Sequence, residues 1–182
     1  MKRKVLLALI ATLAAGLLST PARAGEFGVF GSYWDTKDAQ SGYGGGAKVN
    51  WGVFELRGVY FNDVTAKRVP DRNDFKLHSS PLGVGLKFDL VHDVPVTPYL
   101  GAGGAYYLLS TNQGSIQDEV GWYGVAGLDF TTPSKVGVNV EAVWYDVRGT
   151  VTNLTTDNVH ISDRARVDLS GLGVNAGLIW KF

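Results

Sequence analysis

One short stretch of the sequence carries residue types from which a hydrolase could be built. His160, Ser162 and Asp163 fall within four consecutive positions and offer a base, a hydroxyl nucleophile and an acid. Hydrolysis by such a group requires the three side chains to lie within hydrogen-bond reach of one another. We expect this stretch to be a polar loop, which gives His160 and Ser162 no fixed acidic partner. The sequence therefore predicts that the protein is not an enzyme.

A second set of polar side chains recurs at every other position of otherwise apolar segments. Alternation with a period of two places successive side chains on opposite faces of a β-strand. The residues on the predicted inner faces are Lys48, Asn50, Glu55, Arg57, Lys87, Asp89, Tyr107, Tyr123, Asp129, Asn139, Glu141, Tyr145 and Asn175. Both signs of charge are present, so ion pairing can offset the cost of burial. These residues could line a narrow polar conduit, or they could plug the lumen and neutralise one another.

One ion pair within this set can be placed from the sequence. If a tight turn at Trp51 and Gly52 joins two neighbouring strands, Lys48 lies across from Glu55 on the inner face. Arg57 and Glu141 are further candidates for pairing, but the sequence does not fix their relative depth.

The composition indicates neither metal nor cofactor chemistry. The chain has no Cys and three scattered His, which give no metal-ligand spacing. Its first 24 residues hold four basic and no acidic residues, which leaves 13 basic against 17 acidic residues, a net charge of −4, in the remainder. That balance gives no support to nucleic-acid binding.

The first 24 residues have the pattern of a secretory signal peptide. Lys2, Arg3 and Lys4 precede an apolar run from position 5 to 18, and Ala22 and Ala24 flank a small-x-small cleavage site. The run is too short for a comfortable membrane-spanning helix. We therefore expect an exported protein with a signal peptide over 1–24, cleaved after Ala24, and one domain over 25–182.

Eight alternating segments are predicted as strands, and their connections are alternately long and short. The segments are 26–35, 43–50, 53–62, 80–90, 97–109, 120–130, 136–148 and 167–182. Most are long enough to cross a bilayer when tilted, which takes roughly 9–11 residues. Only helices and closed barrels satisfy every backbone group in lipid, so a membrane location requires a closed barrel.

The outer faces of these strands are predicted to be apolar and to end in aromatic side chains. Leu86, Val140 and Val174 are representative of a lipid-facing wall without charge. Aromatic rings sort toward the two strand ends, as rings do at membrane–water interfaces. The predicted belts comprise Trp51, Phe54, Tyr60, Phe88, Tyr106, Trp122, Phe130, Trp144, Trp180 and Phe182.

Several motifs in the second half of the chain resemble the outer-membrane protein W family. They are Pro98-Tyr99-Leu100-Gly101-Ala102-Gly103, Gly121-Trp122-Tyr123-Gly124, the run from Val138 to Arg148, and the terminal strand that ends on Phe182. The resemblance implies an all-β fold, an eight-stranded antiparallel up-and-down transmembrane β-barrel, in the bacterial outer membrane. It also implies transport of small hydrophobic molecules.

We expect a small barrel that acts as a passive pore or carrier for small solutes, hydrophobic ones included. The alternative is a non-conducting structural or binding barrel whose surface loops contact lipopolysaccharide, host surfaces or other proteins. A third alternative is a lipid A-modifying enzyme built around His160 and Ser162. The expected partners are outer-membrane lipid and lipopolysaccharide, and the barrel-assembly machinery through the C-terminal strand. The segment 67–72 is mixed in charge and is expected to be a solvated loop that could touch lipopolysaccharide phosphates.

Overall fold

Eight antiparallel strands close into a barrel in the computed structural model of the chain. The structure describes residues 25–37, 41–65, 76–91, 94–111, 115–116, 119–152, 154–156, 159–161 and 165–182. The predicted signal peptide and the loop at 67–72 lie outside these ranges. The closed barrel confirms the predicted fold class. Within the described residues, no helix has the length and apolar character needed to span a membrane.

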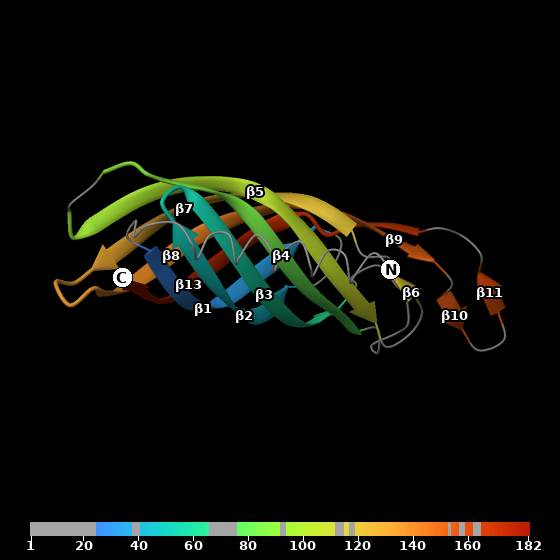
Figure 1. The fold of residues 1–182 in the computed structure, drawn as a ribbon. Coiled ribbons are helices and arrows are strands. Elements are labelled where there is room, and N and C mark those ends of the chain that lie inside the picture. Colours follow the sequence, from blue (N-terminus) through green and yellow to red (C-terminus); the bar gives the residue numbers. More distant parts are fainter. Residues whose placement is uncertain are drawn as a thin grey trace.

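The barrel strands follow one another around the wall in chain order (Figure 1). They are β1 (Gly25–Thr36), β2 (Gly42–Trp51), β3 (Phe54–Thr65), β4 (Lys76–Asp89), β5 (Val96–Thr111), β7 (Glu119–Thr131), β8 (Val136–Asp146) and β13 (Gly171–Lys181). Pairing of β1 with β13 closes the cylinder and leaves no free edge in the wall. Each segment forms a strand because one face meets the lumen and the other the surroundings, which imposes the period-two pattern.

Three short connections define one end of the barrel, which we call the turn end. They join β2 to β3, β4 to β5 and β7 to β8. The opposite end, which we call the loop end, carries the longer connections. Both Gly25 and Phe182 lie at the turn end, where their backbones exchange hydrogen bonds of 2.8 and 2.9 Å.

The β2–β3 turn differs by one residue from the turn predicted from the sequence. Trp51 pairs with Phe54, so the turn consists of Gly52 and Val53, and Gly52 adopts a left-handed φ of 57°. Glycine adopts that conformation without steric cost. The shift places Lys48 opposite Arg57 and Asn50 opposite Glu55. The predicted cross-strand pair of Lys48 and Glu55 is therefore wrong.

The loop end contains more strand than the sequence predicted. The segment 149–166 was expected to be a polar loop, but it contains most of β9 (Arg148–Thr152), together with β10 (Leu154–Thr156), β11 (Val159–Ile161) and the first residues of β12 (Ala165–Asp168). β9 pairs with β12 and with β6 (Ser115–Ile116), and β10 pairs with β11. These strands project beyond the barrel (Figure 1).

Candidate functional site

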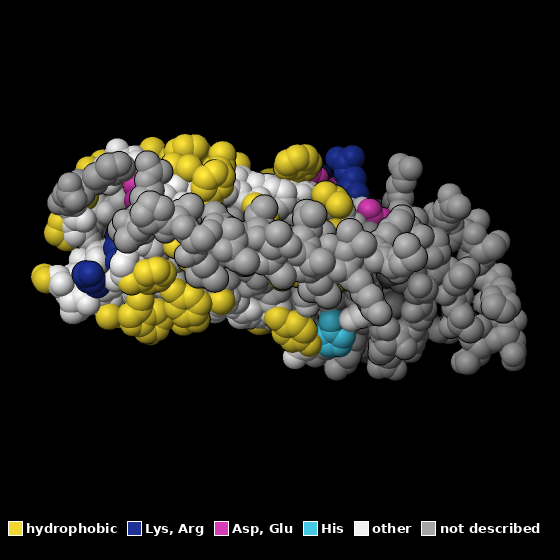
Figure 2. All heavy atoms as spheres, in the orientation of Figure 1, with side chains coloured by type: hydrophobic (Ala, Val, Ile, Leu, Met, Phe, Trp, Pro, Cys, Tyr) yellow, Lys and Arg dark blue, Asp and Glu magenta, His cyan; other side chains and the backbone are white. Residues whose placement is uncertain are grey.

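The outer wall is apolar and exposed over the height of the barrel. Leu86, Val140 and Val174 are each more than 40% exposed, and Figure 2 shows hydrophobic atoms spread along the described surface. Exposed apolar area on this scale is unfavourable in water and is typical of a surface that faces lipid.

Aromatic side chains occupy the two ends of this wall. Trp51 and Phe54 pair across the β2–β3 turn, whereas Trp122 pairs with Asp146 near the loop end. Of the ten residues predicted for the belts, Trp51 and Tyr106 are half-buried and the other eight are exposed.

Inside the barrel, the half near the turn end holds a layer of buried charged and polar side chains, here called the ionic layer. Its seven charged members, all at most 6% exposed, are Glu26, Lys48, Glu55, Arg57, Lys87, Asp129 and Glu141. Three are basic and four are acidic, and each is within salt-bridge distance of an opposite charge. Pairing of this kind makes burial of charge tolerable.

Glu141 is the centre of the ionic layer. Its Oε2 accepts a hydrogen bond from Lys48 Nζ at 2.8 Å and its Oε1 lies 3.1 Å from Arg57 Nη1. The hydroxyl of Tyr99 and Nδ2 of Asn175 (2.7 Å) also donate to this carboxylate. Arg57 in turn donates from Nε to Glu55 Oε1 at 2.7 Å.

A second cluster surrounds Lys87 closer to the turn end. Its ammonium group lies 2.6 Å from Asp129 Oδ2 and 3.2 Å from Glu26 Oε1. Asn139 connects the two clusters, because it donates to Asp129 at 2.6 Å and accepts from Lys48 at 2.9 Å. The ring of Tyr99 lies within 5.2 Å of Lys48 Nζ and 4.3 Å of Lys87 Nζ, distances typical of cation–π contacts.

Toward the loop end, the interior changes from charged to aromatic. The ring centroid of Trp34 lies 5.0 Å from that of Phe61, 5.2 Å from that of Tyr145 and 6.4 Å from that of Tyr107. All four side chains are at most 1% exposed. We call this group the aromatic layer.

Both layers bridge the full width of the barrel. In the closed strand order, β3 and β8 are four strands apart in either direction, and so are β1 and β5. Arg57 and Glu141 therefore come from opposite walls, as do Trp34 and Tyr107. Side chains from opposite walls are in contact at two depths, as expected for the narrow interior of an eight-stranded barrel.

Twelve of the thirteen residues predicted to face the lumen are buried inside the barrel. Asp89 is the exception, because its side chain is 38% exposed at the turn-end rim, 3.7 Å from Lys87. The alternation identified its face correctly, but β4 ends at this residue and the carboxylate reaches water.

Sequence reasoning missed Glu26, Tyr99, Trp34 and Phe61 as interior residues. The period-two pattern contained a signal for all four. Glu26 and Trp34 share the inner face of β1 with Gly28, and Tyr99 has the same parity as Tyr107 on β5. Phe61 has the same parity as Glu55 and Arg57 on β3. For Trp34 and Phe61 this signal competes with their residue type, because large aromatic side chains also suit a lipid-facing wall.

The other candidate residues remain apart from this interior. Ser162 and Asp163 lie outside the described residues, and for His160 the structure gives only its backbone pairing with Thr155. Among the residues that the structure describes, no group of His, Asp and Glu side chains has the arrangement of a metal site.

The closed barrel, its lipid-facing wall and its packed interior define the class of the small bacterial outer-membrane β-barrels. The comparison with solved structures places the fold in the same class. The crystal structure of Neisserial surface protein A matches with a TM-score of 0.55 and 15% identity over 87% of this chain and 96% of that chain.

Two further solved structures are similar at the same level. The E. coli outer membrane protein W has a TM-score of 0.55 and 15% identity, with 89% of this chain and 100% of that chain covered. Outer membrane protein AlkL, determined in lipid bilayers, has a TM-score of 0.55 and 13% identity, with 90% and 95% covered. At these identities, the likeness establishes the fold that the sequence motifs implied. No protein-family model and no curated protein sequence matches the chain.

Proposed function

We propose that this protein is a non-conducting barrel that seals its own lumen and presents the strands beyond the loop end to binding partners. The observation that carries the proposal is the contact of side chains from opposite walls at two depths, by Arg57 with Glu141 and by Trp34 with Tyr107. A passive aqueous pore needs a hydrated path at every depth.

The energetics of the ionic layer support a permanent closure. Opening the lumen near Glu141 would separate this carboxylate from Lys48 and Arg57, neither of which is more than 3% exposed. Separating a buried ion pair without a new partner costs several kcal/mol. The passive pore or carrier that we expected from the sequence is therefore the less favoured function.

The projecting strands support a role in binding. A single residue, Val147, separates β8 from β9, and two residues, Leu169 and Ser170, separate β12 from β13, so the β8–β13 pair continues outward as the β9–β12 pair. In the sheet order β12–β9–β6, each of the two outer strands pairs on one side only among the described residues, and such a sheet edge can accept a further strand from a partner. We propose a protein partner for this surface, with lipopolysaccharide or a host surface as the alternatives.

Single-channel recording in planar bilayers tests the closed lumen. We expect no conductance from the native barrel. A variant with Arg57→Ala, Glu141→Ala, Trp34→Ala and Tyr107→Ala lacks both bridges and should give measurable openings, provided that its folded band is retained in unheated gels. Conductance of the native protein, or solute uptake into liposomes that contain it, would contradict the proposal.

A carrier for small apolar solutes is the second candidate, and one observation favours it. The indole Nε1 of Trp34 and the hydroxyl of Tyr107 are buried without a hydrogen-bond partner in the described part of the chain. A polar group on an otherwise apolar solute could satisfy both. Titration of tryptophan fluorescence with small aromatic alcohols would show saturable binding that Trp34→Phe weakens; a linear response would remove this candidate.

We propose that the barrel-assembly machinery recognises the C-terminal strand, and that the protein has no enzymatic role. Truncation of Trp180 to Phe182 should then abolish outer-membrane insertion, as measured by cell fractionation. Replacing His160 and Ser162 with Ala should leave lipid A acylation unchanged. A change in the acylation pattern would establish an enzymatic role.

A further inference from the structure

The strand pairing fixes the depth of each inner residue along the barrel axis. Paired residues can be followed once around the closed wall, from Asp35 on β1 back to Gly25 on the same strand, ten residues lower. The circuit passes through Leu172, Trp144, Gly124, Ala102, Leu86, Phe54 and Trp51. With strands about 4.8 Å apart and a rise of about 3.3 Å per residue, this offset corresponds to a strand tilt of about 40°. Each residue along a strand therefore changes the depth by roughly 2.5 Å.

One level of the lumen, between the ionic and the aromatic layer, carries mostly small side chains. We call it the intermediate level. It has one inward position from each strand, all within about 5 Å of one depth, and these positions are Ser32, Gly44, Val59, Gly83, Ala105, Tyr123, Val143 and Gly173. Tyr123 is the large member, and it lies against the wall, because a Cβ on Gly83, Gly85 or Gly103 would fall within 3 Å of its side chain. The other seven side chains are too short to meet across the lumen.

Three buried polar groups from three consecutive strands lie at or beside the intermediate level. They are Ser32 Oγ on β1, Asn175 Oδ1 on β13 and the Tyr145 hydroxyl on β8, and their residues are at most 6% exposed. Ser32 pairs directly with Asn175 across the β1–β13 ladder. The Tyr145 hydroxyl lies near the side chains of Asn175 and Arg57.

These three groups are without hydrogen-bond partners in the part of the chain that the structure describes. A buried donor or acceptor that stays unpaired costs free energy, and nearly all such groups in folded proteins have a partner. Three of them on neighbouring strands indicate a ligand that bonds to all three.

The surroundings restrict the chemistry of this ligand. Asn175 Nδ2 donates to Glu141 Oε1 at 2.7 Å, so the acceptor Oδ1 is the free end of the amide and requires a donor. The Arg57 guanidinium near Tyr145 disfavours a cation, and the Glu141 carboxylate beside Asn175 disfavours an anion. A small neutral molecule that both donates and accepts meets these requirements.

We propose that Ser32, Tyr145 and Asn175 bind an ordered water molecule inside the closed lumen. Buried waters typically make about three hydrogen bonds to groups that would otherwise be unsatisfied. The ionic layer closes the lumen on one side of this site and the aromatic layer closes it on the other. The inference rests on the proposed closed lumen for one property, slow exchange, because only a barrel sealed at both layers retains the same water molecule.

Hydroxyl-radical footprinting with heavy-oxygen water tests the site. The barrel in detergent micelles is mixed rapidly with heavy-oxygen water and exposed to a short X-ray pulse, and the modified residues are identified by mass spectrometry. A radical formed from a bound water modifies the nearest ring. Tyr145 is 1% exposed, so bulk radicals do not reach it, and it should carry the light oxygen of the retained water. Tyr43, which is 71% exposed, should carry heavy oxygen from the bulk.

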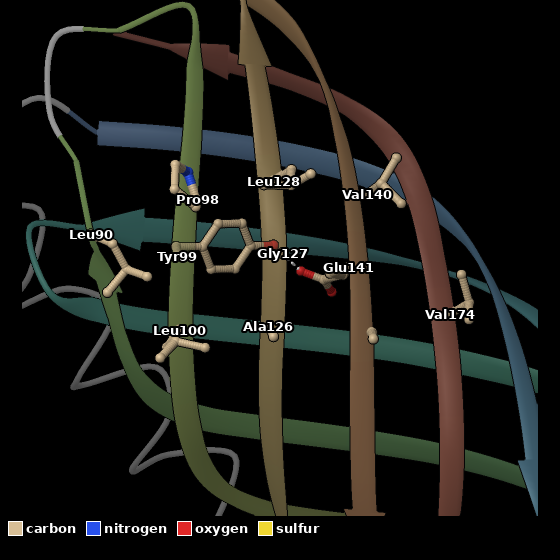
Figure 3. A pocket seen from close by; sticks show the side chains of 11 residues that line it. Leu90, Pro98, Tyr99, Leu100, Ala126, Gly127, Leu128, Val140, Glu141 and Val174 are labelled. Carbon is tan, nitrogen blue, oxygen red and sulfur yellow. Dashed lines mark hydrogen bonds between the residues drawn. The ribbon is translucent and has the colours of Figure 1, made fainter.

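Tyr99 is the matched control for Tyr145. It is also 1% exposed, but its ring crosses Gly127 and its hydroxyl donates to Glu141, so it should stay unmodified (Figure 3). An unmodified Tyr145, or equal modification of both rings, would overturn the water site and leave the closed lumen standing. Heavy oxygen on Tyr145 would support the water site but contradict the closed lumen, since this water would then exchange with the bulk.

Two substitutions give a second measurement. Tyr145→Phe removes a hydroxyl that is bonded to the water, so it should lower the melting temperature by about 2–4 °C, whereas loss of an unpartnered hydroxyl would raise it. Ser32→Ala should reduce the modification of Tyr145, and Ser134→Ala, at an exposed position of the turn end, should leave it unchanged. A higher melting temperature of Tyr145→Phe, or equal labelling in the two serine variants, would overturn the proposal.

Discussion

Arg57 and Glu141 come from strands on opposite walls of the barrel, yet Arg57 Nη1 and Glu141 Oε1 are 3.1 Å apart. Glu141 also holds Lys48, Tyr99 and Asn175. One carboxylate thus connects four strands besides its own across the lumen. Its removal would take the ion pair from Lys48 and leave Arg57 with Glu55 alone.

Glu141→Ala is therefore expected to destabilise the barrel by about 3–5 kcal/mol, because it removes the carboxylate that pairs with buried Lys48 and leaves Arg57 with Glu55 alone. Urea unfolding in detergent micelles, followed by the far-UV signal, measures this change. Asp89→Ala is the matched control, since that carboxylate reaches solvent at the rim, and it should cost under about 1 kcal/mol. Similar losses for both variants would mean that Glu141 does not organise the layer.

Leu86→Arg tests the outer wall. Leu86 is 41% exposed on the outer face of β4, so an arginine there would enter the hydrocarbon region at a cost of roughly 2–4 kcal/mol. Val91→Arg, at the turn end, should cost about 0–1 kcal/mol. Folding free energies in lipid vesicles measure both. A neutral Leu86→Arg would place this face away from lipid.

Gly127 and Tyr99 form a close contact on the inner wall. A Cβ at residue 127 would overlap the Tyr99 ring, so Gly127→Ala should cost about 1–3 kcal/mol through displacement of that ring. In a Tyr99→Ala background the same substitution should cost nothing further. A double-mutant cycle by thermal unfolding measures the coupling. Additive effects would show that the ring does not require glycine at this position.

Asp168, outside the barrel wall, should titrate at an unusually low pH. The hydroxyl and backbone N–H of Ser170 hydrogen-bond to its carboxylate, and with help from Lys37 and Arg148 they hold the pKa of Asp168 below its usual range. Because the folded pKa is depressed, its stabilisation is present above the ordinary pKa and is lost as the pH falls through the folded one. Carboxyl NMR shifts should show this midpoint, and Ser170→Ala should raise it. An unchanged midpoint in Ser170→Ala would contradict the assignment.

The period-two alternation was sufficient to predict the barrel and its eight strands. It succeeded because each wall residue faces either lumen or lipid, so a single rule assigns both faces of every strand. It could not fix the β2–β3 register, since a turn at Gly52 and Val53 differs from one at Trp51 and Gly52 by a single residue. Because of this one-residue difference in the turn, Lys48 lies opposite Arg57 instead of opposite Glu55 as predicted.

The partners inside the barrel were beyond the sequence for a different reason. Contacts across the lumen join residues such as Arg57 and Glu141, 84 positions apart, and depend on how far each strand is staggered around the cylinder. The composition showed that charges of both signs were available, but it did not show which carboxylate would lie at the centre of the ionic layer. The strands at the loop end were not predicted, because their sequence is polar and lacks the alternation of apolar and polar residues that a strand facing a core shows.

The β8–β13 pair continues into β9 and β12. This continuity determines what a protease added to intact cells would do to the protein. Cleavage between β9 and β12 would cut the chain beyond the loop end but leave both strands attached to the barrel, since β8 and β13 are each hydrogen-bonded to two neighbours within the wall. Shaving of intact cells would then disturb the proposed binding surface while the barrel wall stayed closed.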